Sequence, residues 1–211
     1  MELELKKECL DTYELGEPQT LTQEETAETI VPDYCPDIAR IISAEGVVCL
    51  HGGTEQDGVT GTVRVTVLYT PENESGVRAL EFAMPFSAQG EGLAGCAHVV
   101  VETEIELLES RMLNPRKIFT RCKLVTHLAG CRKVCLTISS DAETDPALLV
   151  EKRCCGQTVS LLRQVAEKDL TFSETMSLSL GREGAAELLH CRANGIVTET
   201  KAIGNKLIFK G

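Results

Sequence analysis

The side chains best suited to chemistry lie close together between residues 127 and 135. His127, Cys131 and Cys135 follow one another at intervals of four, and histidine nitrogen and cysteine sulfur are ligands that zinc prefers. On a strand these side chains would share one face but spread over about 27 Å, at ~3.3 Å per residue. Only a sharp bend at Gly130 would bring them to one ion. We therefore predict no metal site, and a small zinc-dependent hydrolase is the alternative.

The other reactive residues form no catalytic pattern. The four histidines have no fixed spacing to a serine or cysteine and an acid that would indicate a triad. Gly90, Gly92 and Gly95 precede a strand-like run, whereas a phosphate-binding loop of this type opens a helix. We therefore predict that the protein is not an enzyme and has no catalytic residues and no cofactor.

Length and composition indicate a globular protein without a membrane span. The chain has 211 residues, of which 43% are hydrophobic, enough for one large or two modest domains. No apolar run approaches the roughly 20 residues of a membrane helix, and the first ten residues lack the apolar stretch of a signal peptide. These features predict a cytoplasmic location without membrane insertion. The ten cysteines are then expected to be reduced and mostly buried.

The charge of the chain is concentrated near its beginning. The net charge is −11, and residues 1 to 30 hold nine acids and two lysines, a net of −7. Nucleic acid and anionic lipid are poor partners for such a chain, because both require a basic surface. We expect the acidic stretch to form a solvated face.

The segment from residue 30 to 42 is expected to organise the fold. Pro32 and Pro36 hold the chain extended, because each disfavours helical geometry in the residue before it. Asp37 could cap a short helix whose isoleucines fall at i, i+3 and i+4, namely Ile38, Ile41 and Ile42. We expect this helix to pack as a plug on the sheet, with all three isoleucines buried.

Strand patterns fill most of the remaining chain up to residue 140. Val63, Val65, Val67 and Tyr69 alternate with polar residues, which predicts a half-buried antiparallel strand. Further runs are expected to be strands over 2–8, 80–84, 98–109, 118–128 and 134–138, with Ile118, Cys122, Leu124 and Leu128 facing inward. The fold class is therefore predicted to be mainly β: an antiparallel sandwich or barrel-like sheet with short helices.

The last part of the chain resembles the first. Residues 149–154 match residues 4–9 at an offset of 145, and 185–193 can be laid on 38–46 at an offset of 147, followed by a hairpin turn at 204–206. Similar offsets and the same order of elements, with a short helix over 185–193 running into a strand as in the first copy, indicate an internal repeat. We predict a first domain over 1–140, a linker over 141–148 and a partial second copy over 149–211.

Five short motifs carry a family resemblance: IVPD (30–33), PDIARI (36–41), Leu68-Tyr69, MPFS (84–87) and LNPRK (113–117). Their order and spacing resemble the SPOCS domain of spore-coat and spore-envelope morphogenesis proteins in endospore-forming, mainly clostridial, bacteria. The resemblance covers about residues 2 to 140. It implies a noncatalytic structural role in sporulation, in the mother-cell cytoplasm around the forespore, with other coat or envelope proteins as partners. Self-association through the incomplete second repeat is a further expectation.

The protein-binding residues are expected on and beside the stiff arm. Candidates are Asp33, Tyr34, Arg40, Arg116 and Lys117. An arm fixed by prolines loses little entropy on docking, and Tyr and Arg are enriched among interface hot spots. The alternative is that these residues only shape turns and cap the helix. A β domain that binds a peptide or glycan is another alternative, although aromatic residues make up only 4% of the chain.

Overall fold

A computed structural model describes residues 4–51 and 58–143, and from the remaining chain residues 151, 153, 155–156, 158–162, 173, 175, 188–193, 195–204 and 206–211. In this described part the chain forms strands and no helix. The strands are β1 (Glu4–Leu15), β2 (Gln19–Ile30), β3 (Ile38–His51), β4 (Gly58–Pro71), β5 (Arg78–Gln89), β6 (His98–Asn114), β7 (Lys117–Glu143), β8 (Glu199–Ile203) and β9 (Lys206–Lys210). Within these residues there is no helix of the length and apolarity needed to cross a membrane.

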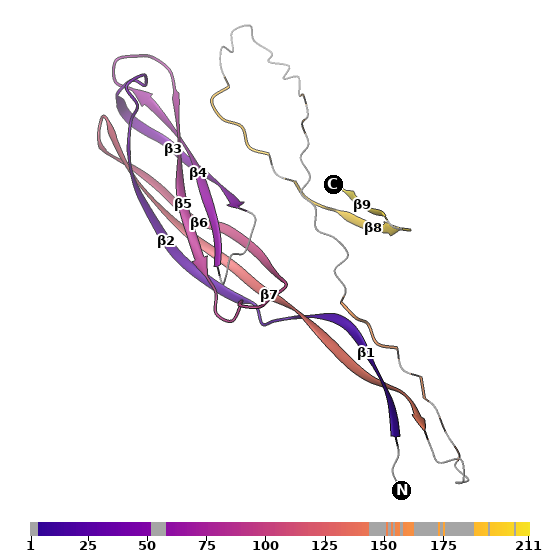
Figure 1. The fold of residues 1–211 in the computed structure, drawn as a ribbon. Coiled ribbons are helices and arrows are strands. Elements are labelled where there is room, and N and C mark those ends of the chain that lie inside the picture. Colours follow the sequence, from indigo (N-terminus) through magenta and orange to yellow (C-terminus); the bar gives the residue numbers. More distant parts are fainter. Residues whose placement is uncertain are drawn as a thin grey trace.

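The strands up to β7 form two antiparallel sheets (Figure 1). In the first, β7 pairs with β6 along one edge and with β2 and then β1 along the other. The second sheet has the order β3-β4-β5. Beyond Cys131, β1 is the only described strand that pairs with β7, so these two strands leave the sandwich as a two-stranded ribbon. The prediction of a mainly β, antiparallel fold is confirmed, and the sheets form a sandwich.

The core lies between the two sheets and follows the alternation of the sequence. Val63, Val65, Val67 and Tyr69 of β4 are buried, as predicted. Inward residues of β5 and β7 complete the same cluster: Leu80, Met84, Phe86, Ile118, Cys122 and Leu124. Each large apolar side chain buried in this way stabilises the fold by about 1.5–3 kcal/mol.

The predicted helix over residues 37–42 is wrong, because this segment begins strand β3. Ile38 pairs with Pro71 of β4 in the antiparallel register. Isoleucine is β-branched and favours strands, and the edge of β4 supplies hydrogen-bond partners that an isolated helical turn lacks. Ile38 is fully buried, Ile41 is half-buried and Ile42 is 50% exposed. The expected burial of all three isoleucines is therefore wrong for Ile42.

The acidic N-terminal stretch forms strands that lie beside the cations of β7. Glu24 and Glu28 of β2 form ion pairs with Arg121 and Lys117, and Asp11 of β1 lies near Lys133. The carboxylate oxygen of Asp11 is 3.5 Å from the Lys133 Nζ atom. These pairs are solvent-exposed and contribute little stability each, but they offset part of the negative charge.

One pair of cysteines departs from the expectation of reduced thiols. Cys9 of β1 and Cys135 of β7 form a disulfide, with their Cα atoms 5.6 Å apart. The register explains the pairing: Cys135 lies opposite Asp11, so Cys9 is its diagonal neighbour. Cys122 is a buried free thiol of the core. Burial, and secondarily the charge of Glu25, raises the pKa of this thiol to about 11.

The described residues after Glu143 include the predicted hairpin. β8 and β9 pair around Gly204, whose φ of +59° is the left-handed conformation that glycine tolerates. Residues 188–193 contain no helix, although a helix was expected over 185–193. Residues 144–150, 152, 154 and 185–187 lie outside the described part, so the linker and repeat predictions fall there in part. β7 includes residues 141–143, the start of the predicted linker.

Candidate binding surface at the arm end of the sandwich

Arg116 joins two motifs that are far apart in the sequence. Residues 31–37, here called the arm, connect β2 to β3. The Arg116 guanidinium lies against the arm: Nη1 donates to the carbonyl of Cys35 at 2.8 Å and Nη2 to the carbonyl of Val31 at 2.9 Å. The same groups contact the carboxylates of Asp37 at 3.0 Å and Asp33 at 3.1 Å. We call these five residues the arginine clasp.

The turn that carries Arg116 is itself built by local side-chain chemistry. The Asn114 side-chain oxygen accepts a hydrogen bond from the Arg116 backbone N–H at 2.9 Å, the Asx turn that this residue type favours. The backbone N–H groups of Val31 and Ile38 donate to the carbonyls of Arg116 and Pro115, both at 2.9 Å. The turn between β6 and β7 therefore holds both ends of the arm.

The middle of the arm is held from the sheet below. The Cys35 N–H donates to the Pro32 carbonyl at 2.9 Å, which closes a tight turn. The Tyr69 hydroxyl donates to the Pro36 carbonyl at 3.3 Å. Burial, followed by the neighbouring Cys35, raises the pKa of the Tyr69 hydroxyl. The arm is thus a rigid loop that is ordered before any partner binds.

The five predicted binding residues all lie at this end of the sandwich, with different surroundings. Asp33 and Arg116 meet in the clasp. Lys117 forms an ion pair with Glu28. The backbone carbonyl of Arg40, an exposed residue of β3, accepts a hydrogen bond from the Thr70 hydroxyl at 3.4 Å. Tyr34, between two clasp residues, is 87% exposed.

The sequence reasoning missed three exposed apolar residues beside the clasp. Ile30 is the last residue of β2 and is 72% exposed, and Met112 and Leu113, also exposed, directly precede the Asn114-Pro115 turn. Together with Tyr34 they form what we call the arm-end surface. The usable signal was the apolar pair immediately before the turn motif, because apolar residues beside a sharp turn at a sheet end have little core to enter.

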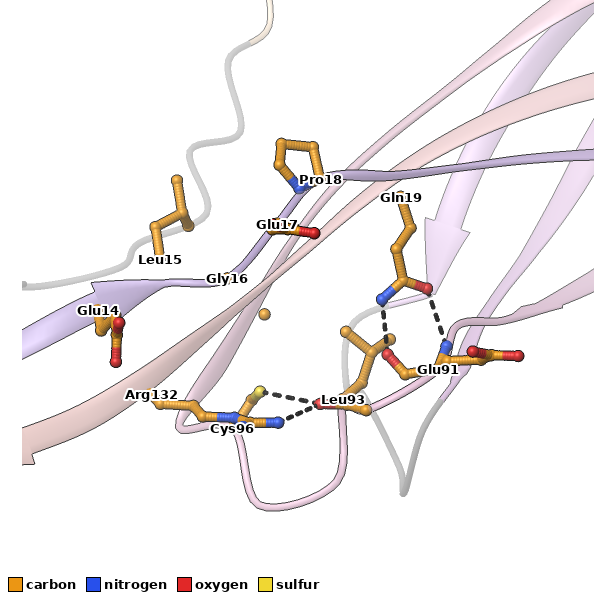
Figure 2. A pocket seen from close by; sticks show the side chains of 12 residues that line it. Glu14, Leu15, Gly16, Glu17, Pro18, Gln19, Glu91, Leu93, Cys96 and Arg132 are labelled. Carbon is orange, nitrogen blue, oxygen red and sulfur yellow. Dashed lines mark hydrogen bonds between the residues drawn. The ribbon is translucent and has the colours of Figure 1, made fainter.

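A hollow of about 600 Å³ lies where the β1–β2 connection meets the loop after β5 (Figure 2). Its polar groups hold the loop. The Gln19 side-chain amide donates to the Glu91 carbonyl at 2.6 Å and accepts from the Glu91 N–H at 2.9 Å. The Arg132 guanidinium donates to the Gly92 carbonyl at 2.6 Å, and the Cys96 thiol lies 3.9 Å from the same oxygen. We interpret this hollow as a structural feature, in which Gln19 and Arg132 fix the loop after β5, and not as a binding site.

The three residues weighed as zinc ligands do not converge. β7 runs as a continuous strand through His127, Cys131 and Cys135. His127 Nδ1 shares a hydrogen bond of 3.0 Å with the Thr20 hydroxyl, Cys131 is buried, and Cys135 is bonded to Cys9. Among the residues that the structure describes, no three histidine, cysteine or acidic side chains gather as a metal site.

Comparisons with known proteins return no match: no family model, no curated protein and no solved structure is similar to this chain. Its function is therefore inferred from its own residues and from the motif resemblance.

Proposed function

We propose that this chain is a noncatalytic interaction module that assembles with other spore-coat or spore-envelope proteins during sporulation, on the mother-cell side of the forespore. The resemblance of the IVPD, PDIARI and LNPRK motifs to the SPOCS domain supports this role. The observation that carries the proposal is the arginine clasp, in which Asp33 and Arg116, 83 residues apart in the chain, meet beside exposed apolar side chains.

The arm-end surface has the physical properties of a protein-binding site. Clustered exposed apolar residues commonly mark an interaction surface on a protein of this size. Tyr34 offers a large ring with a polar tip, the type of side chain that anchors interfaces. Because the clasp already orders the arm, docking loses little conformational entropy. Arg40 and Lys117 would lie at the polar rim of such an interface.

The partner that fits this surface is a protein with an apolar recess for the Tyr34 ring. The clasp carboxylates face Arg116 and are locally compensated, so strong selection for a basic partner is not expected. Apolar contact would supply most of the affinity, and the charged rim would set orientation.

The test is a pair of matched double variants in the complete chain. Tyr34→Ala/Arg40→Ala removes an exposed apolar side chain and an arginine from the arm end. The control, Val100→Ala/Arg64→Ala, removes the same kinds of side chain from β6 and β4, away from the arm. Partners are captured from extracts of sporulating clostridial cells, identified by mass spectrometry, purified and titrated against each variant.

The arm-end variant should keep the melting temperature of the parent and bind the identified coat protein at least about tenfold more weakly, as expected for loss of a hot-spot residue. The control should bind like the parent. Equal binding by both variants would refute the arm-end surface, and capture of the same partners from vegetative cells would refute the role in sporulation.

A further inference from the structure

The ribbon of β1 and β7 has an outer edge, on β1, with which no other described strand pairs. From residue 132 onward β7 pairs only with β1 among the described strands. A two-stranded ribbon is only marginally stable in water, and the N–H and C=O groups along the outer edge of β1 can template another strand. Hydrogen-bond partners for the outer edge of β1 must therefore come from outside the two sheets.

A segment far along the chain already reaches that edge. The carbonyl of Leu162 accepts two hydrogen bonds from β1, one from the Tyr13 backbone N–H at 2.9 Å and one from the Thr12 hydroxyl at 3.0 Å. Thr12 and Leu162 are 150 residues apart in the sequence, so their contact does not follow from proximity along the chain. Thr12 is only 8% exposed, a low value for a residue beyond the body of the sandwich.

The chemistry of the segment suits an added strand. Residues 158–162 read Thr-Val-Ser-Leu-Leu, with β-branched and apolar side chains of the kind that strands favour. In the structure these five residues are exposed and are not yet paired as a regular strand. The ribbon face beside Thr12 offers apolar neighbours at alternate positions, because directly opposed residues of β1 and β7 share a face: Leu10 lies opposite Leu136, and Thr12 opposite Val134.

We propose that the outer edge of β1 around Thr12 and Tyr13 is a strand-addition site, and that its occupant is residues 158–162 of the same chain. Main-chain hydrogen bonds would provide the affinity, and the apolar side chains of the segment would fix its position. This site is separate from the arm-end surface and does not depend on the proposed function. It ties the part of the chain that follows β7 back to the first strand.

A second copy of the chain is the rival occupant. If residues 158–162 of one molecule docked on β1 of another, the contact would be head-to-tail and could propagate into open chains of molecules. The observed contact joins two parts of one chain, which is why we assign the site to the molecule's own segment.

The test compares two double variants of the full-length chain by hydrogen exchange. Leu161→Asp/Leu162→Asp places charges in the proposed strand, and the control Leu207→Asp/Ile208→Asp places the same charges in the exposed hairpin strand β9. The Tyr13 amide should exchange about fivefold faster or more in the first variant, the factor expected for loss of one backbone hydrogen bond. It should not change in the control.

Two further measurements decide the remaining outcomes. The exchange rate of the Leu124 amide, in core strand β7, reports global unfolding. Thr12→Val removes only the side-chain donor to Leu162. This milder variant should also speed exchange of the Tyr13 amide and leave that of Leu124 unchanged. Unchanged Tyr13 exchange in both variants would overturn the proposal. Sedimentation velocity should find a monomer at every concentration; oligomers that dissociate on dilution together with loss of Tyr13 protection would assign the site to a second copy instead.

Discussion

Replacing Arg116 by alanine should destabilise the fold even though its side chain is one-third exposed. The variant leaves the carbonyls of Val31 and Cys35 without their charged donor. Hydrogen bonds to charged groups are worth about 1.5–3 kcal/mol each, which gives about 3–6 kcal/mol for two. Since 33% of the side chain is exposed, water replaces part of this loss, and we expect a decrease of about 2–4 kcal/mol in the free energy of unfolding.

The carboxylates of the clasp contribute much less to this figure. Asp37 and especially Asp33 are exposed, and solvent-exposed ion pairs are worth about 0–1 kcal/mol. Lys117→Ala, which breaks only the exposed pair with Glu28, is the matched control and should cost less than about 1 kcal/mol. Arg116→Lys should recover less than half of the loss, because an ammonium group cannot reach two carbonyls in a fixed fork.

Urea unfolding at equilibrium, followed by circular dichroism, measures these differences, with the slope of the transition checked for constancy. A loss below about 1 kcal/mol for Arg116→Ala, no larger than for Lys117→Ala, would mean that the arm does not depend on the clasp. The assumption of a preordered arm, on which the proposed binding surface rests, would then fail.

Three other predictions use the same assay or simple thiol chemistry. Ile38→Ala should lose about 2–5 kcal/mol as a buried core truncation, whereas Ile42→Ala should lose less than about 1 kcal/mol; equal losses would contradict the strand assignment. Reduction of the denatured protein should release two thiols beyond those titrated without reductant, and Cys9→Ser/Cys135→Ser should abolish that difference; ten free thiols before reduction would exclude the disulfide. Because the pKa of Cys122 is raised from 9.0 to about 11, the folded state keeps this proton longer than the unfolded chain, so stability should fall as the pH rises from 9 to 11; a fall as steep in Cys122→Ala would refute that origin.

The sequence predicted strands at the positions of β4, β5, β6 and β7 but not at the edge strand β2, for a physical reason. In β4 and β7 one face enters the core, so most inward positions are apolar and the alternation is visible, although Thr120 and Thr126 of β7 are buried as well. β2 lies at an edge, and its inward face includes Gln23 and Glu25, both half-buried. An inward charge protects an edge strand from pairing with other chains, but it removes the apolar alternation by which a strand is recognised.

The mistaken helix has an equally specific cause. Ile38 and Ile41 both pack against the core although they are three residues apart, a spacing that fits one face of a helix and not a regular strand. The register of β3 shifts between Ile38 and Arg40 and again between Ile41 and Ser43. Each irregularity adds a residue and returns the next side chain to the same face. A strand with two bulges therefore imitates helical spacing, and only the pairing with β4 distinguishes them.

The clasp also changes how the predicted binding residues should be tested. The sequence predicts Asp33 and Arg116 as interface residues, but the guanidinium donors of Arg116 already form hydrogen bonds to the arm of the same chain. Arg116→Ala should therefore reduce stability and partner binding together, whereas Tyr34→Ala/Arg40→Ala should reduce binding alone. Binding titrations at a temperature well below the melting point of each variant separate the two effects. If Arg116→Ala kept full affinity for the partner despite its lower stability, the arm geometry would be irrelevant to recognition, and Tyr34 would act only as an exposed side chain on a flexible loop.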